Sequence, residues 1–139
     1  MQKKFDLVKS YERQLIFLLN LEGWRLYWTG EGYKSYDAVG FDDNGNSCVL
    51  ELKFRKKTYR LKILEKLKYD NLLSAKAEKK YYGVIDKKGL YIFDLEKITD
   101  TTQFIDCPSS TFFDEKEVKR QKEVFLLGNA NKRYFFNFF

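Results

Sequence analysis

Hydrophobic side chains near the start of the chain recur at a helical spacing. Between residues 5 and 22 they stand three or four positions apart, which places them on one face of a helix. The members of this set are Val8, Tyr11, Leu15, Leu18 and Leu19. Gly23 follows them and is a typical stop signal. The pattern therefore predicts a first amphipathic helix over residues 5–22.

Stretches with the pattern of strands follow this helix. Residues 24–28 and 33–41 are rich in aromatic and aliphatic side chains, and residues 47–54 alternate between apolar and polar positions. Turn-forming residues separate them, with glycines in segment 29–32 and an Asn-Gly pair in segment 42–46. We therefore predict that these strands form a meander.

A second helix and two further strands complete the predicted core. Residues 61–79 form a charged amphipathic stretch without Gly or Pro, which indicates a helix, and residues 81–85 and 90–93 have the pattern of strands. The order α-β-β-β-α-β-β predicts an α/β fold. We expect a single domain over residues 1–139, whose central mixed β-sheet of about five strands is flanked by helices, with the core at about 5–95.

The C-terminal extension, from about residue 96 to residue 139, has weaker signals. Residues 101–111 are turn-like and contain the only proline of the chain. Residues 114–127 predict a third helix, opened by an acidic capping pattern and stopped by a glycine. The aromatic tail at 134–139 predicts an edge strand that docks within the molecule or on a partner.

Composition restricts the classes of function. With 44% hydrophobic and 33% charged residues, the 139-residue chain predicts a globular protein without a membrane span. The absence of histidine excludes Ser-His-Asp triads, histidine-ligated zinc and a histidine general base. Cys48 and Cys107 have no metal-ligand spacing, and the N-terminus lacks a secretory pattern, so we expect a cytoplasmic protein with reduced thiols. The net charge of +6 is a weak indication of a polyanionic partner.

Charged side chains that could carry chemistry lie on two neighbouring predicted strands. Val49, Glu51 and Lys53 share one face of their strand because side chains alternate. Asp37 stands among apolar neighbours on the preceding strand, where burial requires a partner or a cation. If the register places Asp37 opposite Glu51, both carboxylates can bind Mg²⁺, and Lys53 can orient a water and stabilise a phosphorane. An ordinary salt bridge on a solvated strand face remains the alternative.

Asp37, a short turn and the sequence Glu51-Leu52-Lys53, placed between two helices, resemble the PD-(D/E)XK nuclease superfamily. Tyr36 stands where the motif of the family has proline. The resemblance implies a restriction-endonuclease-like or Holliday-junction-resolvase-like small nuclease, of a kind found in phages and bacteria. It also implies that Asp37 and Glu51 bind Mg²⁺, for which Mn²⁺ can substitute, and that Lys53 is catalytic. Glu12 fits the further acid of the first helix, although the edge of the buried stripe explains it equally well.

Basic residues follow the motif directly and could neutralise phosphates. The superfamily also tends to place a polar or basic side chain from the second helix at the site, and three candidates share one stripe of that predicted helix. The complete set of candidates for nucleic-acid binding is Arg55, Lys56, Lys57, Arg60, Lys62, Lys66 and Tyr69. A solvated charged loop is the alternative for the basic run, and the sequence leaves open which helix residue faces the site.

These features together predict a Mg²⁺-dependent endonuclease or a structure-selective junction nuclease that hydrolyses DNA, with RNA not excluded as a substrate. A homodimer is one option, because double-strand cleavage needs two sites and one domain supplies one. Two other classes remain open. The chain could be a nucleic-acid-binding module of the same fold without turnover, or an interaction protein whose basic charge is incidental.

Overall fold

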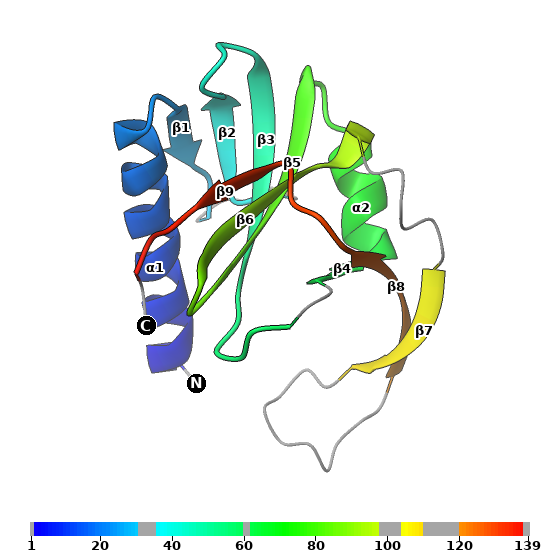
Figure 1. Cartoon of the computed structure of the whole chain (residues 1–139). Coiled ribbons are helices and arrows are strands. Elements are labelled where there is room, and N and C mark those ends of the chain that lie inside the picture. The colour runs from blue at the N-terminus through cyan, green and yellow to red at the C-terminus, as the bar shows by residue number, and fades with distance from the viewer. Residues whose placement is uncertain (1, 31–35, 60–61, 98–103, 110–119, 138–139) are drawn as a thin grey trace.

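A six-stranded mixed β-sheet forms the centre of the molecule, with one helix on each of its faces (Figure 1). This computed structural model describes residues 2–30, 36–59, 62–97, 104–109 and 120–137. A second sheet, of three strands, lies beside the second helix. The elements are α1 (Gln2–Leu21), β1 (Arg25–Trp28), β2 (Ala38–Phe41), β3 (Ser47–Phe54), β4 (Lys62–Glu65), α2 (Lys66–Leu73), β5 (Lys79–Asp86), β6 (Gly89–Asp94), the 3₁₀ turn η1 (Leu95–Lys97), β7 (Phe104–Ser109), β8 (Arg120–Leu127) and β9 (Lys132–Tyr134).

The main sheet has the strand order β1-β2-β3-β5-β6-β9. Strands β1, β2 and β3 form the predicted meander, because each pairs antiparallel with the next. β3 and β5 run parallel, which requires a crossover connection, and β4 and α2 provide it. The mixed sheet and its flanking helices confirm the predicted α/β fold class.

Alternation along the strands separates two hydrophobic clusters. Cys48, Leu50 and Leu52 of β3 pack on the α1 side, together with Leu15 and Leu19 of the helix. On the other face the buried residues come from β3, β5 and β6 and from the crossover; they include Val49, Leu72, Tyr82, Val84 and Phe93. The hydrophobic positions of β3 are therefore buried on both faces, and any polar side chain on this strand has to be partnered.

The predicted second and third helices are wrong in part. Residues 62–65 form strand β4, so α2 covers only Lys66–Leu73 of the predicted 61–79. Residues 120–127 form β8, which lies between β4 and β7 and pairs antiparallel with both. The turn-like segment likewise contains a strand, β7. The physical reason is tertiary pairing: these apolar stretches find strand partners far away in the sequence. Residues 114–119 lie outside the described part of the chain.

The tail docks within the molecule as predicted, but the predicted strand at 134–139 is wrong in its bounds: the strand covers Lys132–Tyr134, and residues 135–137 are not in a strand. β9 (Lys132–Tyr134) is the edge strand beside β6, and Trp24 Nε1 donates a hydrogen bond of 2.9 Å to Tyr134 OH. Residues 138–139 of the predicted strand lie outside the described residues. The C-terminal extension thus contributes a strand to the main sheet.

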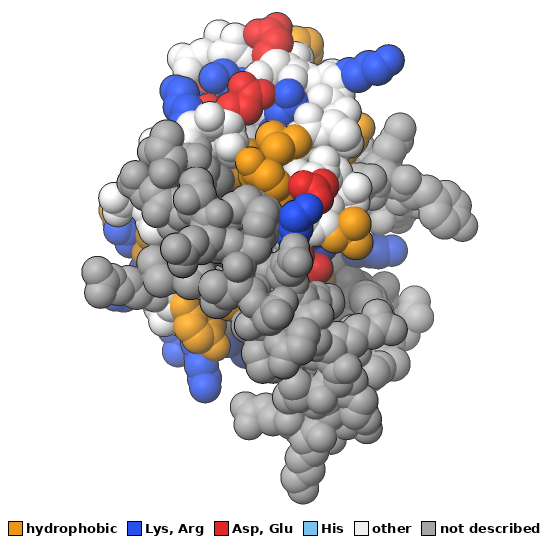
Figure 2. Space-filling view, turned by 90° about the vertical axis from the view of Figure 1, so that its right-hand side faces the viewer, with side chains coloured by type: hydrophobic (Ala, Val, Ile, Leu, Met, Phe, Trp, Pro, Cys, Tyr) orange, Lys and Arg blue, Asp and Glu red, His pale blue; other side chains and the backbone are white. Residues whose placement is uncertain are grey.

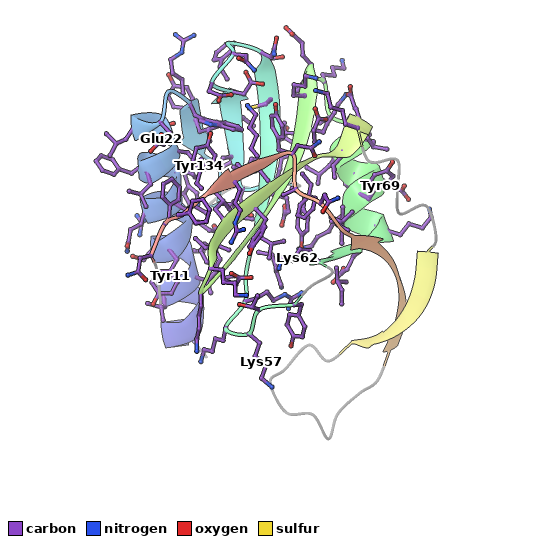
Figure 3. The ribbon with its side chains drawn as sticks, in the orientation of Figure 1. Tyr11, Glu22, Lys57, Lys62, Tyr69 and Tyr134 are labelled. Atoms are coloured by element: carbon purple, nitrogen blue, oxygen red, sulfur yellow. The ribbon has the colours of Figure 1, made fainter. Side chains whose placement is uncertain are left out.

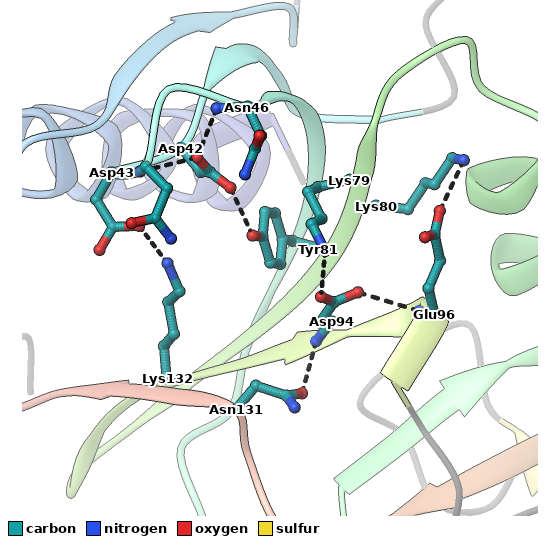
Figure 4. A network of polar contacts seen from close by, with 11 residues as sticks. Asp42, Asp43, Asn46, Lys79, Lys80, Tyr81, Asp94, Glu96, Asn131 and Lys132 are labelled. Carbon is teal, nitrogen blue, oxygen red and sulfur yellow. Dashed lines mark hydrogen bonds and ion pairs between the residues drawn. The ribbon is translucent and has the colours of Figure 1, made fainter.

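Polar contacts attach the C-terminal strand to the end of the sheet where β5 begins (Figure 4). The buried Asp42 carboxylate accepts hydrogen bonds from the backbone amides of Asn44 and Asn46 and from Tyr81 OH, the last at 2.8 Å. Asn131 accepts one from the Asp94 amide, and Lys132 pairs with Asp43. The buried Asp42 carboxylate is therefore partnered by donors from its own turn and from β5. In the part of the chain described here, no helix is both long and apolar enough to cross a membrane.

Candidate active site

Asp37 lies at the point where β2 separates from β3. Its amide donates to Leu50 O at 2.9 Å, which continues the β2–β3 ladder. Beyond this point the side chain of Asp37 replaces the backbone as the partner of β3, because Asp37 Oδ2 accepts a hydrogen bond of 2.8 Å from the amide of Leu52. The carboxylate is thus fixed at the end of the ladder, directly beside the segment of β3 that carries Glu51 and Lys53.

Glu51 is the buried acid of this group, with 8% of its surface exposed. It points to the α2 side of the sheet, as the alternation of β3 predicts. Lys68 of α2 reaches it, and Lys68 Nζ lies 3.2 Å from Glu51 Oε1. Lys68 was not among the predicted residues. No sequence signal singled it out, because several lysines stand close together in this stretch, and only the structure shows that Lys68 lies one helical turn before Leu72, the buried residue of α2.

Glu12 of α1 joins the same cluster. It is 7% exposed, and its Oε1 accepts a hydrogen bond of 3.1 Å from Trp28 Nε1. Burial raises the pKa of Glu12, and the negative charge of Asp37 raises it further. The helix and the second strand therefore bring two carboxyl groups within electrostatic reach of each other.

Burial disfavours the ionised forms of both strand carboxyls, and for Glu51 the negative charge of Asp37 adds to this effect. Burial and the charge of Asp37 raise the pKa of Glu51 to about 7, although Lys68 opposes this. Burial also raises the pKa of Asp37, against the effects of the Leu52 amide, Lys68 and a hydrogen bond with Glu51. Two carboxyls in hydrogen-bond contact cannot both be ionised without cost, so they share a proton or bind a cation.

Lys53 is half-buried on the same face of β3, two residues beyond Glu51. Burial lowers its pKa, and the positive charges of Arg55 and Lys68 lower it further, while Glu65 and Glu51 oppose them. The Lys53 ammonium is thus partly withdrawn from water, and both acidic and basic side chains lie near it. In such an environment its charge acts more strongly on a neighbouring group than it would in bulk water.

The donor set of this cluster fits a hard divalent cation. Asp37 and Glu51 offer carboxylate oxygens, the ligands that Mg²⁺ prefers, and a cation would relieve the repulsion between them. Among the described residues no group of three or more His, Cys, Asp and Glu side chains is arranged to hold a metal. Two carboxylates are nevertheless the usual protein contribution to a Mg²⁺ site that is completed by water and substrate phosphates.

The predicted nucleic-acid-binding residues are not all brought to this cluster. Lys62 is 6% exposed, forms an ion pair of 3.3 Å with Asp86 and lies over the ring of Tyr91 at 4.2 Å from its centroid. The ammonium of Lys62 is thus buried by the residues it pairs with, which does not favour the predicted contact of Lys62 with nucleic acid; that contact stays a prediction. Lys57 instead extends outward from the loop after β3, whereas Lys62 lies near the centre of the molecule (Figure 3).

The remaining candidates occupy varied positions. Lys56 is exposed like Lys57, Arg55 is half-buried, and Arg60 lies outside the described residues. On α2, Lys66 forms an ion pair of 2.8 Å with Asp70, and Tyr69 packs against the second hydrophobic cluster. On the side of the molecule that carries α2, basic and acidic side chains lie close together around a small hydrophobic group (Figure 2). Carboxylates pair with two of the lysines of α2, Lys66 and Lys68.

Comparison with known proteins supports the fold and no more. The sequence matches no protein-family model, and no curated protein sequence matches it. A solved structure of similar fold is Hjc, a Holliday junction resolvase from the archaeal hyperthermophile Archaeoglobus fulgidus. The TM-score is 0.54 and the identity 15%, over 86% of this chain and 81% of the resolvase chain. The expected likeness to a resolvase-type nuclease is therefore confirmed for the fold.

Proposed function

We propose that this chain is a metal-dependent nuclease that hydrolyses phosphodiester bonds in DNA, with branched DNA as the preferred class of substrate. One observation carries the proposal: Asp37, directly before β2, lies beside the part of β3 that carries Glu51 and Lys53, and burial there disfavours the ionised carboxyls. The similarity to a Holliday junction resolvase supports the choice of branched DNA, since the fold is shared.

The carboxylates of Asp37 and Glu51 are the groups that would hold Mg²⁺, with Mn²⁺ as a substitute. A divalent cation bound there supplies Lewis acidity toward a phosphate oxygen and toward the attacking water. Asp37 keeps its orientation through the hydrogen bond from the Leu52 amide, so this ligand does not have to be ordered when the site is filled. Glu12 adds negative charge beside Asp37 and thereby raises the affinity of the cluster for cations.

Lys53 supplies the positive charge that acts during the reaction. Its ammonium lies next to Glu51 and can donate hydrogen bonds to the attacking water and to the phosphate oxygen on which negative charge develops. Lys68 acts differently. Because it binds Glu51 directly, it holds that side chain in place and is a positioning residue.

The proposal is tested by nuclease assays on a single strand, a linear duplex and a four-way junction, each with Mg²⁺, Mn²⁺ or EDTA. We expect cleavage with either metal, no cleavage in EDTA and no cleavage by Glu51→Ala. Glu96→Ala is the matched control, because Glu96 is an exposed acid that pairs with Lys80 at 2.9 Å on another part of the surface. If wild-type protein binds DNA and cleaves no substrate, the chain is a binding module instead. Cleavage by Glu51→Ala at the wild-type rate would also reject the proposal.

Cleavage of both strands of a junction requires two sites, and one copy of the chain supplies one. We therefore propose that the active form on branched DNA is a homodimer. Light scattering of the protein with and without a junction tests this part separately: a complex with one copy per junction would contradict it, without affecting the assignment of the site.

A further inference from the structure

A row of side chains crosses the main sheet from the candidate site to the edge strand β9. The register pairs Lys53 of β3 with Val84 of β5, Val84 with Tyr91 of β6, and Tyr91 with Arg133 of β9. Directly paired residues point to the same face of a sheet, so Arg133 lies on the face of Lys53 and Glu51. Neighbouring strands are about 4.8 Å apart, which puts the backbone of Arg133 about 14 Å from that of Lys53.

The Arg133 guanidinium is held between two aromatic rings. It lies 4.5 Å from the ring centroid of Tyr91 and 4.6 Å from that of Phe135, and its Nη2 donates to Lys88 O at 3.3 Å. Arginine has five N–H donors, so others remain to bind an anion. No carboxylate within the described ranges forms an ion pair with Arg133.

Phe135 is the most exposed large hydrophobic side chain of the described surface, at 78%. Its neighbours in the tail behave differently, because Tyr134 and Phe136 pack against the first hydrophobic cluster with their rings stacked on each other. The Phe135 ring thus covers one side of the Arg133 guanidinium and presents its own outer surface to solvent. An exposed aromatic ring beside an ordered cation is the usual platform for an unpaired base.

Exposed lysines connect this platform with the candidate site. The loop after β3 contains Lys56 and Lys57, and the β5–β6 turn contains Lys87 and Lys88, all of them exposed. The two segments lie side by side, because the amide of Arg55, at the start of the loop, donates a hydrogen bond of 2.9 Å to Ile85 O near the end of β5. The one acid of this turn, Asp86, is 1% exposed and is neutralised by buried Lys62, so this end of the sheet is positive at its surface.

We propose that Arg133 and Phe135 form a second DNA-binding subsite, in which Arg133 binds a phosphate and Phe135 stacks on an unpaired base of the strand that is cut. The inference rests on the proposed nuclease function. Successive phosphates of one strand advance about 3.4 Å along the axis of a duplex and lie farther apart than this through space, so a contact about 14 Å from Lys53 lies fewer than about four nucleotides from the scissile bond. Base stacking is interrupted where duplex arms branch, so a base there unpairs and reaches Phe135 at lower cost than one inside a linear duplex, which makes the subsite selective for branched over linear DNA.

The restricted conformation of the Arg133 side chain supports this assignment. A long flexible side chain loses conformational entropy when it binds a phosphate, and this loss weakens binding. Here the two rings and the Lys88 carbonyl already restrict the guanidinium in the free protein. Its planar donor array suits a phosphate better than an ammonium does.

The test is DNA binding measured by fluorescence anisotropy in EDTA, so that no strand is cut. The probes are a labelled single strand, a linear duplex and a four-way junction, each titrated at several salt concentrations. We expect Arg133→Gln to weaken binding by about tenfold. The slope of the logarithm of affinity against that of salt concentration should fall by about 0.9 for the duplex, the loss of one phosphate contact. Phe135→Ala should weaken binding of the single strand by about tenfold and leave the duplex unchanged.

Arg25→Gln is the matched control. Arg25 is also an exposed arginine over an aromatic ring, 5.1 Å from the Phe41 centroid, but it lies on β1 at the opposite edge of the sheet. The Arg25→Gln variant should bind each DNA probe with the affinity of the wild type. All three variants change exposed side chains, and equal melting temperatures would show that the fold is intact.

The outcomes separate this inference from the proposed function. If the wild type cleaves DNA but Arg133→Gln retains its affinity and salt slope, or loses no more than Arg25→Gln, the subsite is rejected and the nuclease assignment stands. If the wild type binds DNA without cleavage and Arg133→Gln shows the expected losses, the subsite is supported and the nuclease assignment fails. Wild-type protein that binds none of the probes at low salt would reject both.

Discussion

Replacing Glu51 by Gln should stabilise the metal-free protein at neutral and alkaline pH. Glu51 is 8% exposed, and burial together with Asp37 raises its pKa from 4.5 to about 7. In the unfolded chain the carboxyl loses its proton near pH 4.5, whereas in the folded protein it does so near pH 7. Between these values the folded state binds more protons, so its stability falls as the pH rises. Gln removes the charge and keeps a similar shape.

The structure sets an upper limit for this effect. One pKa unit corresponds to about 1.4 kcal/mol, so a rise from 4.5 to about 7 corresponds to roughly 3 kcal/mol above pH 7. This value is a net cost that already contains the opposing effect of Lys68, and relaxation of the protein and water around the charged carboxylate lowers the real cost below it. We therefore expect a gain of about 1–3 kcal/mol at pH 8, or a melting temperature higher by about 3–9 °C, and almost no gain at pH 4.5.

Thermal unfolding followed by circular dichroism in EDTA, at pH 4.5 and pH 8, measures this difference. Glu96→Gln is the control, because the Glu96 carboxylate is exposed. Adding Mg²⁺ at pH 8 should raise the melting temperature of the wild type and leave that of Glu51→Gln unchanged, because a bound ion stabilises only the form that binds it. A Gln variant that melts at or below the wild-type temperature at pH 8, or gains equally at both pH values, would refute the reasoning.

Three further substitutions test separate parts of the molecule. Lys68→Met should bind Mn²⁺ severalfold more tightly in titration calorimetry, because the ammonium no longer competes for Glu51 3.2 Å away; weaker binding would contradict this. Lys53→Met should bind DNA normally but cleave it about 100- to 1000-fold more slowly in single-turnover assays, and wild-type cleavage would exclude its role. Asp86→Ala should lower the free energy of unfolding in urea by about 3–5 kcal/mol, because it leaves Lys62 charged and buried; a loss below about 1 kcal/mol would show that Lys62 finds water.

The elements that were predicted correctly carry their pattern within their own residues. The helical spacing of α1 and the strand patterns of β3 and β5 are local properties of the chain, and each element has enough residues to show them. β4 and β8 are different. They pair with each other through the register Lys62↔Leu127 to Glu65↔Val124, and the partners are about sixty residues apart. A local pattern cannot show a partner at that distance, so both segments were predicted as helix.

The candidate site divides in the same way. Strand alternation alone places Glu51 and Lys53 on one face, so this pair is readable from the sequence, whereas the position of Asp37 beside them depends on the register of β2 with β3. Lys68 and Lys62 could not be ranked from the sequence, since both belong to a basic stretch of similar composition. Their roles depend on how the crossover of β4 and α2 lies on the sheet. Lys68 reaches Glu51 there, and Lys62 is buried against Asp86.

The sequence by itself therefore determined the chemical groups and their order: two acids and a lysine on neighbouring strands, without histidine, in an α/β chain. Only the tertiary structure decided how these groups behave. It buries Glu51 beside Asp37 and so moves its pKa to about 7, and it aligns Arg133 with Lys53 across strands distant in the sequence. The physical reason is that alternation is a property of each strand alone. Burial and the distance between charges depend on which segments pack together.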